Sequence, residues 1–214
     1  MSASLAISEE LIAPGRPNRP GTKINPTYIT IHNTANSNEG ADADAHSRFV
    51  RNKGYYDWKG KKRWVSWHFT VDDTEIIKQL PLNEAAYHAG KGNSVSIAIE
   101  QCMHQGIDTG AADERLCQLV AALCEAHSIP TSKIVPHKHW TGKNCPVLLL
   151  KKWDQIINRV KTLRNNRELL SVQVMSETEM LGSAIDELSE EAQAQLQEFD
   201  IEDDVLFDLS EASE

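Results

Sequence analysis

The chain has 214 residues, of which 40% are hydrophobic and 25% are charged. This composition is globular, and the length fits one domain of about 150 to 170 residues with an appended segment, or two small domains. No stretch approaches the roughly 20 apolar residues of a membrane span, which excludes an integral membrane protein. Residues 1–21 have no basic start and no apolar run, so we expect no secretory signal and reduced cysteines.

The net formal charge of −9 is divided unevenly along the chain. Residues 176–214 hold 14 Asp and Glu and no Lys or Arg, so the other 17 acids and all 22 bases give residues 1–175 a charge of +5. A basic body favours an anionic partner. Its basic run, residues 59–63 (KGKKR), is typical of a solvated loop, and we therefore expect no nucleic-acid binding.

The hydrophobic pattern predicts strands mixed with helices over residues 28–163. Residues 28–32 (YITIH) alternate in the manner of a strand, and apolar residues between 111 and 128 recur at helical spacing. The other expected elements are a helix over 41–52, a surface loop over 53–63, a hairpin of strands 65–72 and 75–80, strands over 96–102 and 134–137, and a helix over 146–163. Together they predict an α/β fold with a mixed central sheet flanked by helices.

Residues 164–167 (RNNR) are typical of a linker and predict one domain over 1–164 and an acidic segment over 165–214. Within that segment, residues 187–199 can form one amphipathic acidic helix with its apolar face ending at Phe199. One interpretation is a solvated acidic segment with a marginal helix. The other is a small helical unit that pairs with a second copy or folds back on the basic body.

A histidine and a cysteine lie eight residues apart in the segment PHKHWTGKNCP (residues 136–146). Imidazole nitrogen and thiolate sulfur are preferred ligands of Zn²⁺, so His137 and Cys145 are candidate ligands. Pro146 suits the first position of a helix, which would place the Cys145 thiol at a helix N-terminus and favour the thiolate. If the segment is extended, only one of His137 and His139 would ligate. For this pair alone, the alternative is a surface histidine and a buried cysteine.

Two more polar residues stand in apolar strands. His32 closes the strand 28–32, and Glu100 is an acid embedded in the strand 96–102 (SIAIEQC). A set of two histidines and one cysteine leaves a fourth tetrahedral position for water. This is the arrangement of a catalytic zinc site and not of a closed structural one.

Four motifs in this order, YITIHNTAN, SWHFTVDD, SIAIE and PHKHWTGKNCP, resemble zinc-dependent N-acetylmuramoyl-L-alanine amidases of the phage-endolysin and Bacillus-autolysin type. These are relatives of bacteriophage T7 lysozyme and the peptidoglycan recognition proteins. The resemblance, over roughly residues 10–160, implies Zn²⁺ bound by His32, His137 and Cys145. It implies that Glu100 acts as general base and acid and that Lys143 stabilises the oxyanion. The implied reaction is hydrolysis of the amide between N-acetylmuramic acid and the L-alanine of the stem peptide in bacterial peptidoglycan.

The substrate-binding residues are less defined by the motifs. Trp67 stands where some relatives have a catalytic tyrosine, so Glu100 must suffice, and we expect Trp67 to line the cleft. We expect His68 and His88 to contact the sugar or the peptide, with a structural role as the alternative. Further residues that could stack on glycan, or simply pack, are Trp58, Trp64 and Trp140.

Two other functions fit the same motifs. One is a non-catalytic peptidoglycan-binding protein, although such members of the recognition-protein branch lack the cysteine ligand; the other is a zinc-dependent stem-peptide endopeptidase. Without a signal peptide, a wall-degrading enzyme made in the cytoplasm would reach the wall through a holin-made hole, as expected for a phage or prophage of a Gram-positive host. We expect no stable membrane association, and wall targeting or self-association through residues 165–214.

Overall fold

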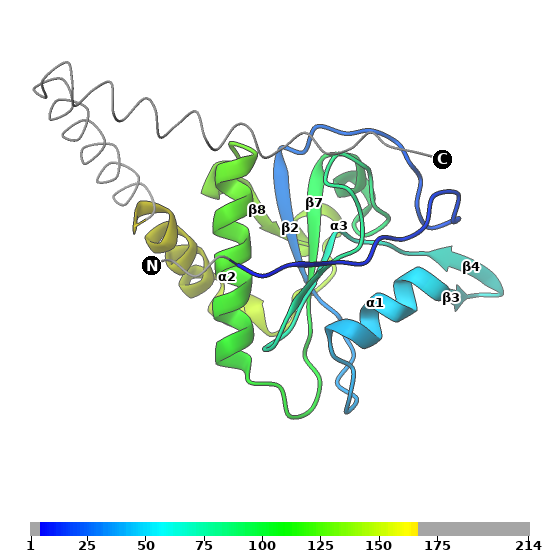
Figure 1. Cartoon of the computed structure of the whole chain (residues 1–214), viewed down its shortest axis with the longest axis horizontal. Helices are drawn as coiled ribbons and strands as arrows, with labels where there is room; N and C mark the ends of the chain where they lie inside the picture. The colour runs from blue at the N-terminus through cyan, green and yellow to red at the C-terminus, as the bar shows by residue number, and fades with distance from the viewer. Residues whose placement is uncertain (1–4, 167–214) are drawn as a thin grey trace, which may run out of the picture. The chain divides into compact units, whose positions relative to one another are not determined.

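A six-stranded mixed sheet forms the centre of the computed structural model, which describes residues 5–166 (Figure 1). The strands are β1 (Ser8–Glu9), β2 (Tyr28–Asn33), β5 (Phe69–Val71), β6 (Ile76–Lys78), β7 (Ser96–Gln101) and β8 (Ile134–Pro136), in the order β1-β6-β5-β7-β2-β8. β7 runs parallel to β5 and β2, β8 runs parallel to β2, and β6 runs antiparallel to β5. The predicted α/β fold with a mixed central sheet is confirmed.

Helices pack on both faces of this sheet. They are α1 (Ala43–Asn52), α2 (Thr109–Ala126), α3 (Lys138–Thr141), the short η1 (Gly90–Ser94), η2 (Thr131–Lys133) and η3 (Leu149–Lys152), and the helical residues 153–166. Asp42 precedes α1, and its carboxylate accepts the Ala45 amide; Asp108 precedes α2 and caps its first amides in the same way. The predicted helices over 41–52 and 111–128 are confirmed to within two residues. In the described residues, no helix is long and apolar enough to cross a membrane.

Alternation along the strands separates the two sides of the sheet. Ile29 and Ile31 of β2 belong to a buried cluster with Leu116 of α2. Ala98 of β7 belongs to a second cluster, with Val50 of α1. Because successive side chains of a strand point to opposite faces, the even-numbered residues of β2 and β7 face away from α2. The even-numbered polar residues Thr30, His32, Ser96 and Glu100 therefore lie on the side of the sheet that α1 covers.

A second, two-stranded sheet projects beside α1 (Figure 1). Strands β3 (Tyr55–Trp58) and β4 (Lys61–Trp64) pair antiparallel, with Tyr55 opposite Trp64 and Trp58 opposite Lys61. The surface loop expected over 53–63 is therefore wrong, because these residues form a hairpin. Lys59 and Gly60, between the strands, have φ of 49° and 73°, the left-handed backbone that a tight hairpin turn requires.

The hairpin predicted from residues 65–72 and 75–80 is confirmed as β5 and β6, although both strands are shorter. Asp72 follows β5 and is buried at the turn. Its carboxylate accepts hydrogen bonds from the amides of Thr74 and Glu75, and also from the amide of Ala43 at the start of α1. One acidic side chain thus joins the turn of this hairpin to the first helix. The predicted acidic helix over 187–199 lies outside the described residues.

Candidate metal centre and active site

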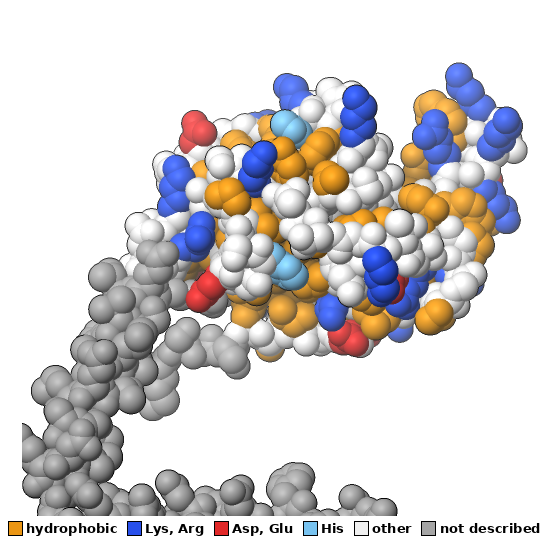
Figure 2. Space-filling model, turned by 90° about the horizontal axis from the view of Figure 1, so that it is seen from above, with side chains coloured by type: hydrophobic (Ala, Val, Ile, Leu, Met, Phe, Trp, Pro, Cys, Tyr) orange, Lys and Arg blue, Asp and Glu red, His pale blue; other side chains and the backbone are white. Residues whose placement is uncertain are grey.

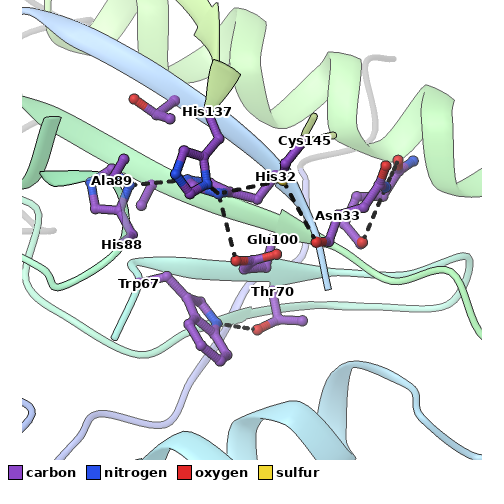
Figure 3. A network of polar contacts seen from close by, with 12 residues as sticks. His32, Asn33, Trp67, Thr70, His88, Ala89, Glu100, His137 and Cys145 are labelled. Carbon is purple, nitrogen blue, oxygen red and sulfur yellow. Dashed lines mark hydrogen bonds and ion pairs between the residues drawn. The ribbon is translucent and has the colours of Figure 1, made fainter. Parts of the chain in front are cut away.

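Two histidines and a cysteine from three segments meet on the α1 side of the sheet (Figure 3). His32 lies in β2, His137 directly follows β8, and Cys145 follows α3. All three side chains are buried, and one ligand atom of each lies within 4.8 Å of the others. Nδ1 of His32 is 3.1 Å from Nδ1 of His137 and 3.9 Å from Sγ of Cys145. Ligand atoms of a tetrahedral zinc site lie roughly 3.3–3.6 Å apart, so the cluster has the spacing of a metal-ligand set.

Backbone hydrogen bonds hold these segments together. The His137 amide donates to the Ile31 carbonyl of the neighbouring strand, and the Lys138 amide donates to the Cys145 carbonyl. The Cys145 thiol points toward the carbonyl oxygen of Asn33, with Sγ and oxygen 4.0 Å apart. His137 and Cys145 lie more than a hundred positions after His32 in the chain, and backbone hydrogen bonds to the sheet hold them next to it.

Cys145 does not lie at a helix N-terminus. Pro146 lies in a bend after a cis peptide bond, η3 begins at Leu149, and the following α-helical residues begin at 153. The start of the helix predicted over 146–163 is therefore wrong, and the thiol gains no stabilisation from a helix dipole. Burial raises the pKa of the Cys145 thiol to about 11, and the charge of Glu100 acts in the same direction. A bound cation is what would stabilise the thiolate here.

Burial keeps the two histidines of the cluster neutral. It lowers the pKa of His32 well below its ordinary value, with smaller contributions from the charges of His88 and His137. It lowers the pKa of His137 to about 4, and the charge of Lys143 acts in the same direction. Metal ions bind the neutral imidazole, so two neutral rings and one cysteine fit Zn²⁺, which prefers nitrogen and sulfur ligands.

Glu100 lies beside the cluster because β2 and β7 are parallel neighbours. His32 and Glu100 are partners in the register of these strands and project from the same face. Oε1 of Glu100 is 3.8 Å from Nδ1 of His32, while its Oε2 is buried and has no hydrogen-bond partner among the described residues. Burial raises the pKa of Glu100 to about 8, against the positive charge of Lys143. Such a carboxyl group is suited to exchange a proton with a water molecule or a substrate.

Lys143 is exposed two residues before Cys145, and it lines the same cleft as Glu100. Burial has the larger effect on the pKa of Glu100, His137 and Cys145, raising the first and last and lowering that of His137. The positive charge of Lys143 lowers all three pKa values. Its ammonium group is therefore close enough to act on charge that develops next to the cluster.

An open cleft of about 1020 Å³ leads to these groups. One wall is the β3–β4 hairpin, through Tyr56, Arg63 and Trp64. Figure 2 shows Lys and Arg side chains gathered on the projection at the right, where Figure 1 places β3 and β4, and a hollow between this projection and the rest of the face. The volume lies at the upper end of the range for small-molecule pockets, which suits an extended substrate.

The structure places the three residues predicted to contact substrate in different surroundings. Trp67 and His88 line the cleft. His68 is fully buried, where its Nε2 donates to the Glu84 carbonyl and its Nδ1 accepts the Ala98 amide. Both ring nitrogens of His68 are therefore bonded to backbone, so the expected substrate contact is not available and the alternative structural role holds.

Thr30 and Ser96, two polar residues behind the cluster, lie in the motifs YITIHNTAN and SIAIE, but the sequence alone assigned them no role. Thr30 and Ser96 are fully buried and hydrogen-bonded to each other, and the Trp140 indole donates to Thr30. The available signal was the alternation of YITIH, which places Thr30 on the same face as His32. His139 packs its ring near Tyr28 and Trp140 and takes no part in the cluster, because residues 138–141 are helical and not extended.

Comparison with protein-family models matches residues 21–147 to N-acetylmuramoyl-L-alanine amidase, the family Amidase_2. The matched region includes the two histidines and the cysteine of the cluster as well as Glu100 and Lys143. The chain belongs to this family, and the resemblance drawn from the four motifs is confirmed.

Two curated relatives are N-acetylmuramoyl-L-alanine amidases of Bacillus subtilis (strain 168), XlyA and CwlH. The chain is 45% identical to XlyA over 152 residues (69% of this chain, 48% of XlyA) and 39% identical to CwlH over 163 residues (74% of this chain, 62% of CwlH). The solved catalytic domain of XlyA matches with a TM-score of 0.66 at 44% identity, over 72% of this chain and 99% of that domain. The chain thus spans about half the length of XlyA and under two thirds of CwlH.

Proposed function

We propose that this chain is a zinc-dependent N-acetylmuramoyl-L-alanine amidase that hydrolyses the amide between the lactyl group of N-acetylmuramic acid and the L-alanine of the stem peptide. The observation that carries the proposal is the cluster of His32, His137 and Cys145 beside the buried Glu100, at one open cleft. Family membership and the catalytic domain of XlyA support the same activity.

The three clustered side chains would hold the metal, and the open side of the cleft leaves room for a fourth ligand. When bound, Zn²⁺ supplies a Lewis acid that polarises the scissile carbonyl and lowers the pKa of a water molecule. The chain supplies two neutral imidazoles and a thiol for this purpose, without a carboxylate among the clustered ligands.

Glu100 moves the proton in this mechanism. Its carboxylate takes a proton from the attacking water and delivers it to the nitrogen of the departing L-alanine. The unpaired Oε2 leaves an atom free for this exchange, and a pKa raised by burial toward about 8 favours the acid half of the cycle near neutral pH. Lys143, at the rim, stabilises the negative charge that develops on the carbonyl oxygen.

The cleft beyond these groups would hold glycan and peptide. Trp67 and His88 line its inner part, and the β3–β4 hairpin forms an outer wall. Tyr56 and Trp58 of this hairpin are 47% and 52% exposed, unusually open for aromatic side chains. Alternation along β3 places both rings on one face of the hairpin, where they are available to stack on sugar rings.

Digestion of purified Gram-positive peptidoglycan tests the function. New end groups are identified by mass spectrometry for the untreated protein, a chelator-treated sample with and without added Zn²⁺, and the Glu100→Ala variant. Free L-alanine amino termini should appear, disappear with chelator, return with Zn²⁺, and be absent from the variant. New termini inside the stem peptide would instead assign an endopeptidase. Protein that sediments with the wall and releases no new ends would be a non-catalytic binding protein.

We further propose that residues 1–164 are the catalytic domain and that the acidic segment 165–214 is a separate unit for wall targeting or self-association. The support is the difference in formal charge, which is −14 for residues 176–214 and +5 for residues 1–175. Truncation after Arg164 should change the oligomeric mass in light scattering or the rate of wall lysis. Unchanged values for both would overturn this assignment. The site of action would be the wall, reached after release through a holin-type hole.

A further inference from the structure

A chain of hydrogen bonds runs from Trp140 to His32 behind the metal-ligand cluster. Nε1 of Trp140 donates to Oγ1 of Thr30 over 2.9 Å, and Thr30 donates to Oγ of Ser96 over 2.8 Å. Oγ of Ser96 is 3.3 Å from Nε2 of His88. Nδ1 of His88 is 3.0 Å from Nε2 of His32. These five residues are called the relay below.

Two groups with a single hydrogen-bonding role, the indole of Trp140 and the carbonyl of Gly92, determine where the protons of the relay lie. The indole of Trp140 can only donate. Ser96 donates its hydroxyl proton to the carbonyl oxygen of Gly92 over 2.8 Å, and a carbonyl can only accept. Ser96 has no second proton, so its oxygen accepts one from Nε2 of His88. His88 is therefore the Nε2–H tautomer, with a lone pair on Nδ1.

The same reasoning extends to His32. Because Nδ1 of His88 accepts, Nε2 of His32 must donate, which leaves a lone pair on Nδ1 of His32. This nitrogen is the one that faces the cluster, 3.1 Å from Nδ1 of His137 and 3.9 Å from Sγ of Cys145. The other tautomer of His32 would direct an N–H into the cluster and could not ligate a metal.

We propose that His88 is a positioning residue that holds His32 in the tautomer able to bind Zn²⁺, and that Trp140, Thr30 and Ser96 set the tautomer of His88 itself. This inference rests on the proposed function of the chain as a zinc amidase. It gives His88 a role other than the substrate contact expected from the sequence, since both of its ring nitrogens already have partners.

The loop that carries His88 is built to hold this arrangement. Oδ1 of Asn93 accepts the amides of His88 and Ala89 over 2.9 and 2.7 Å, which fixes the backbone next to the ring. A Cβ at Gly92 would lie 2.8 Å from Nε1 of Trp140, so glycine permits the close approach of the indole that starts the relay.

Ring tautomers and zinc affinity test the proposal on the full chain. Long-range ¹H–¹⁵N spectra of the metal-free protein should show the proton on Nε2 in both His32 and His88. The His88→Phe variant keeps a ring but loses the acceptor, and its affinity for Zn²⁺, measured by competition with a chromophoric chelator, should fall about 10- to 100-fold. His88→Asn, whose Oδ1 can replace Nδ1 as acceptor, should recover most of that affinity. The matched control is His139→Phe at an exposed histidine outside the relay, with unchanged affinity.

Two results would overturn the proposal: a proton on Nδ1 of His32 in the metal-free protein, or full zinc affinity in a folded His88→Phe variant. Backbone amide spectra show whether each variant is folded, and His88→Asn remains informative if His88→Phe is not. Failure of the unmodified chain to bind Zn²⁺ would instead overturn the zinc dependence of the proposed function. The tautomers of the metal-free protein would still decide the relay.

Discussion

His32 on β2 and Glu100 on β7 are partners in a parallel strand register, with 3.8 Å between Nδ1 and Oε1. Both project from the face of the sheet opposite α2. Neighbouring strands lie roughly 4.8 Å apart, so the separation of the two side chains is set by the backbone hydrogen bonds of the sheet. A proposed metal ligand and a proposed acid–base group are thus held on rigid elements, which is the placement that precise chemistry requires.

The Glu100→Gln substitution should reduce the rate of peptidoglycan hydrolysis by at least about 10²-fold, because the amide cannot accept and return a proton. Zinc stoichiometry should remain that of the unmodified chain, since Glu100 is not among the clustered ligands. Activity is followed by the release of soluble fragments and metal content by atomic absorption. Loss of zinc from the folded variant would contradict the separation between ligand and proton carrier.

The Lys143→Met substitution should lower kcat on a soluble muropeptide by roughly 10²-fold, because the charge that faces the developing oxyanion is removed. Lys143 is exposed, so the fold should not change. Lys138→Met is the matched control, since Lys138 is also exposed but does not line the cleft. Equal kcat values for the two variants would show that Lys143 does not stabilise the oxyanion.

Replacing both Tyr56 and Trp58 by alanine should weaken sedimentation with insoluble wall by at least about 1 kcal/mol, roughly fivefold in affinity, because two exposed rings on the hairpin are lost. Cleavage of a short soluble muropeptide should be much less affected, since Tyr56 lies on the outer wall of the cleft and Trp58 is exposed on the hairpin outside it. Ile7→Ala, at an exposed apolar residue that does not line the cleft, is the control. The interpretation of the hairpin as a glycan-binding wall fails if the double variant sediments like this control.

Asp72 should make stability depend on acidic pH. Burial raises the pKa of Asp72, but hydrogen bonds from the Ala43, Glu75 and Thr74 amides and from the Thr74 hydroxyl outweigh it, and the pKa is lowered overall. A carboxyl group with a pKa lower in the folded than in the unfolded state stabilises the fold above its unfolded pKa of about 3.9. This contribution is lost as the pH falls through the lower, folded value.

Urea unfolding at several pH values checks the contribution of Asp72. The Asp72→Asn variant should be less stable than the unmodified chain by about 1–3 kcal/mol at pH 7, and the difference should shrink in acid. Asp57→Asn, at an exposed carboxyl group of the hairpin, should show no comparable difference at either pH. A difference for Asp72→Asn that is constant with pH would indicate lost packing and not a lost charge.

The local pattern of apolar residues was sufficient to predict many of the strands and helices. The alternation of YITIH predicted β2, and helical spacing predicted α2 to within two residues, because both depend on periods that the backbone imposes on neighbouring side chains. His137 and Cys145 were candidate ligands from their chemistry and spacing, and the resemblance to the family implied the full set with His32. The order of the four motifs indicated the family, which the comparison with family models confirms.

Other features depended on contacts between distant segments. The basic, aromatic residues 53–63 have no strict alternation, and they form a hairpin through cross-strand pairs such as Tyr55 with Trp64. The helix expected from Pro146 begins later, since the chain first turns to bring Cys145 toward His32. The sequence suggested the same role for His68 and His88, yet the fold bonds the His68 ring to backbone groups and places the His88 ring against His32, a proposed metal ligand.

The amino-acid sequence by itself determined the α/β class, which follows from short-range periodicity, and the family with its candidate ligand set, which follows from four motifs in a fixed order. Only the tertiary structure decided which histidines share a hydrogen bond and where the wall of the cleft lies. Parallel strand register placed Glu100 next to His32, and the packing of Trp140 against Gly92 aligned the relay. Such distances between remote residues arise from the folded sheet, and no local pattern of residues encodes them.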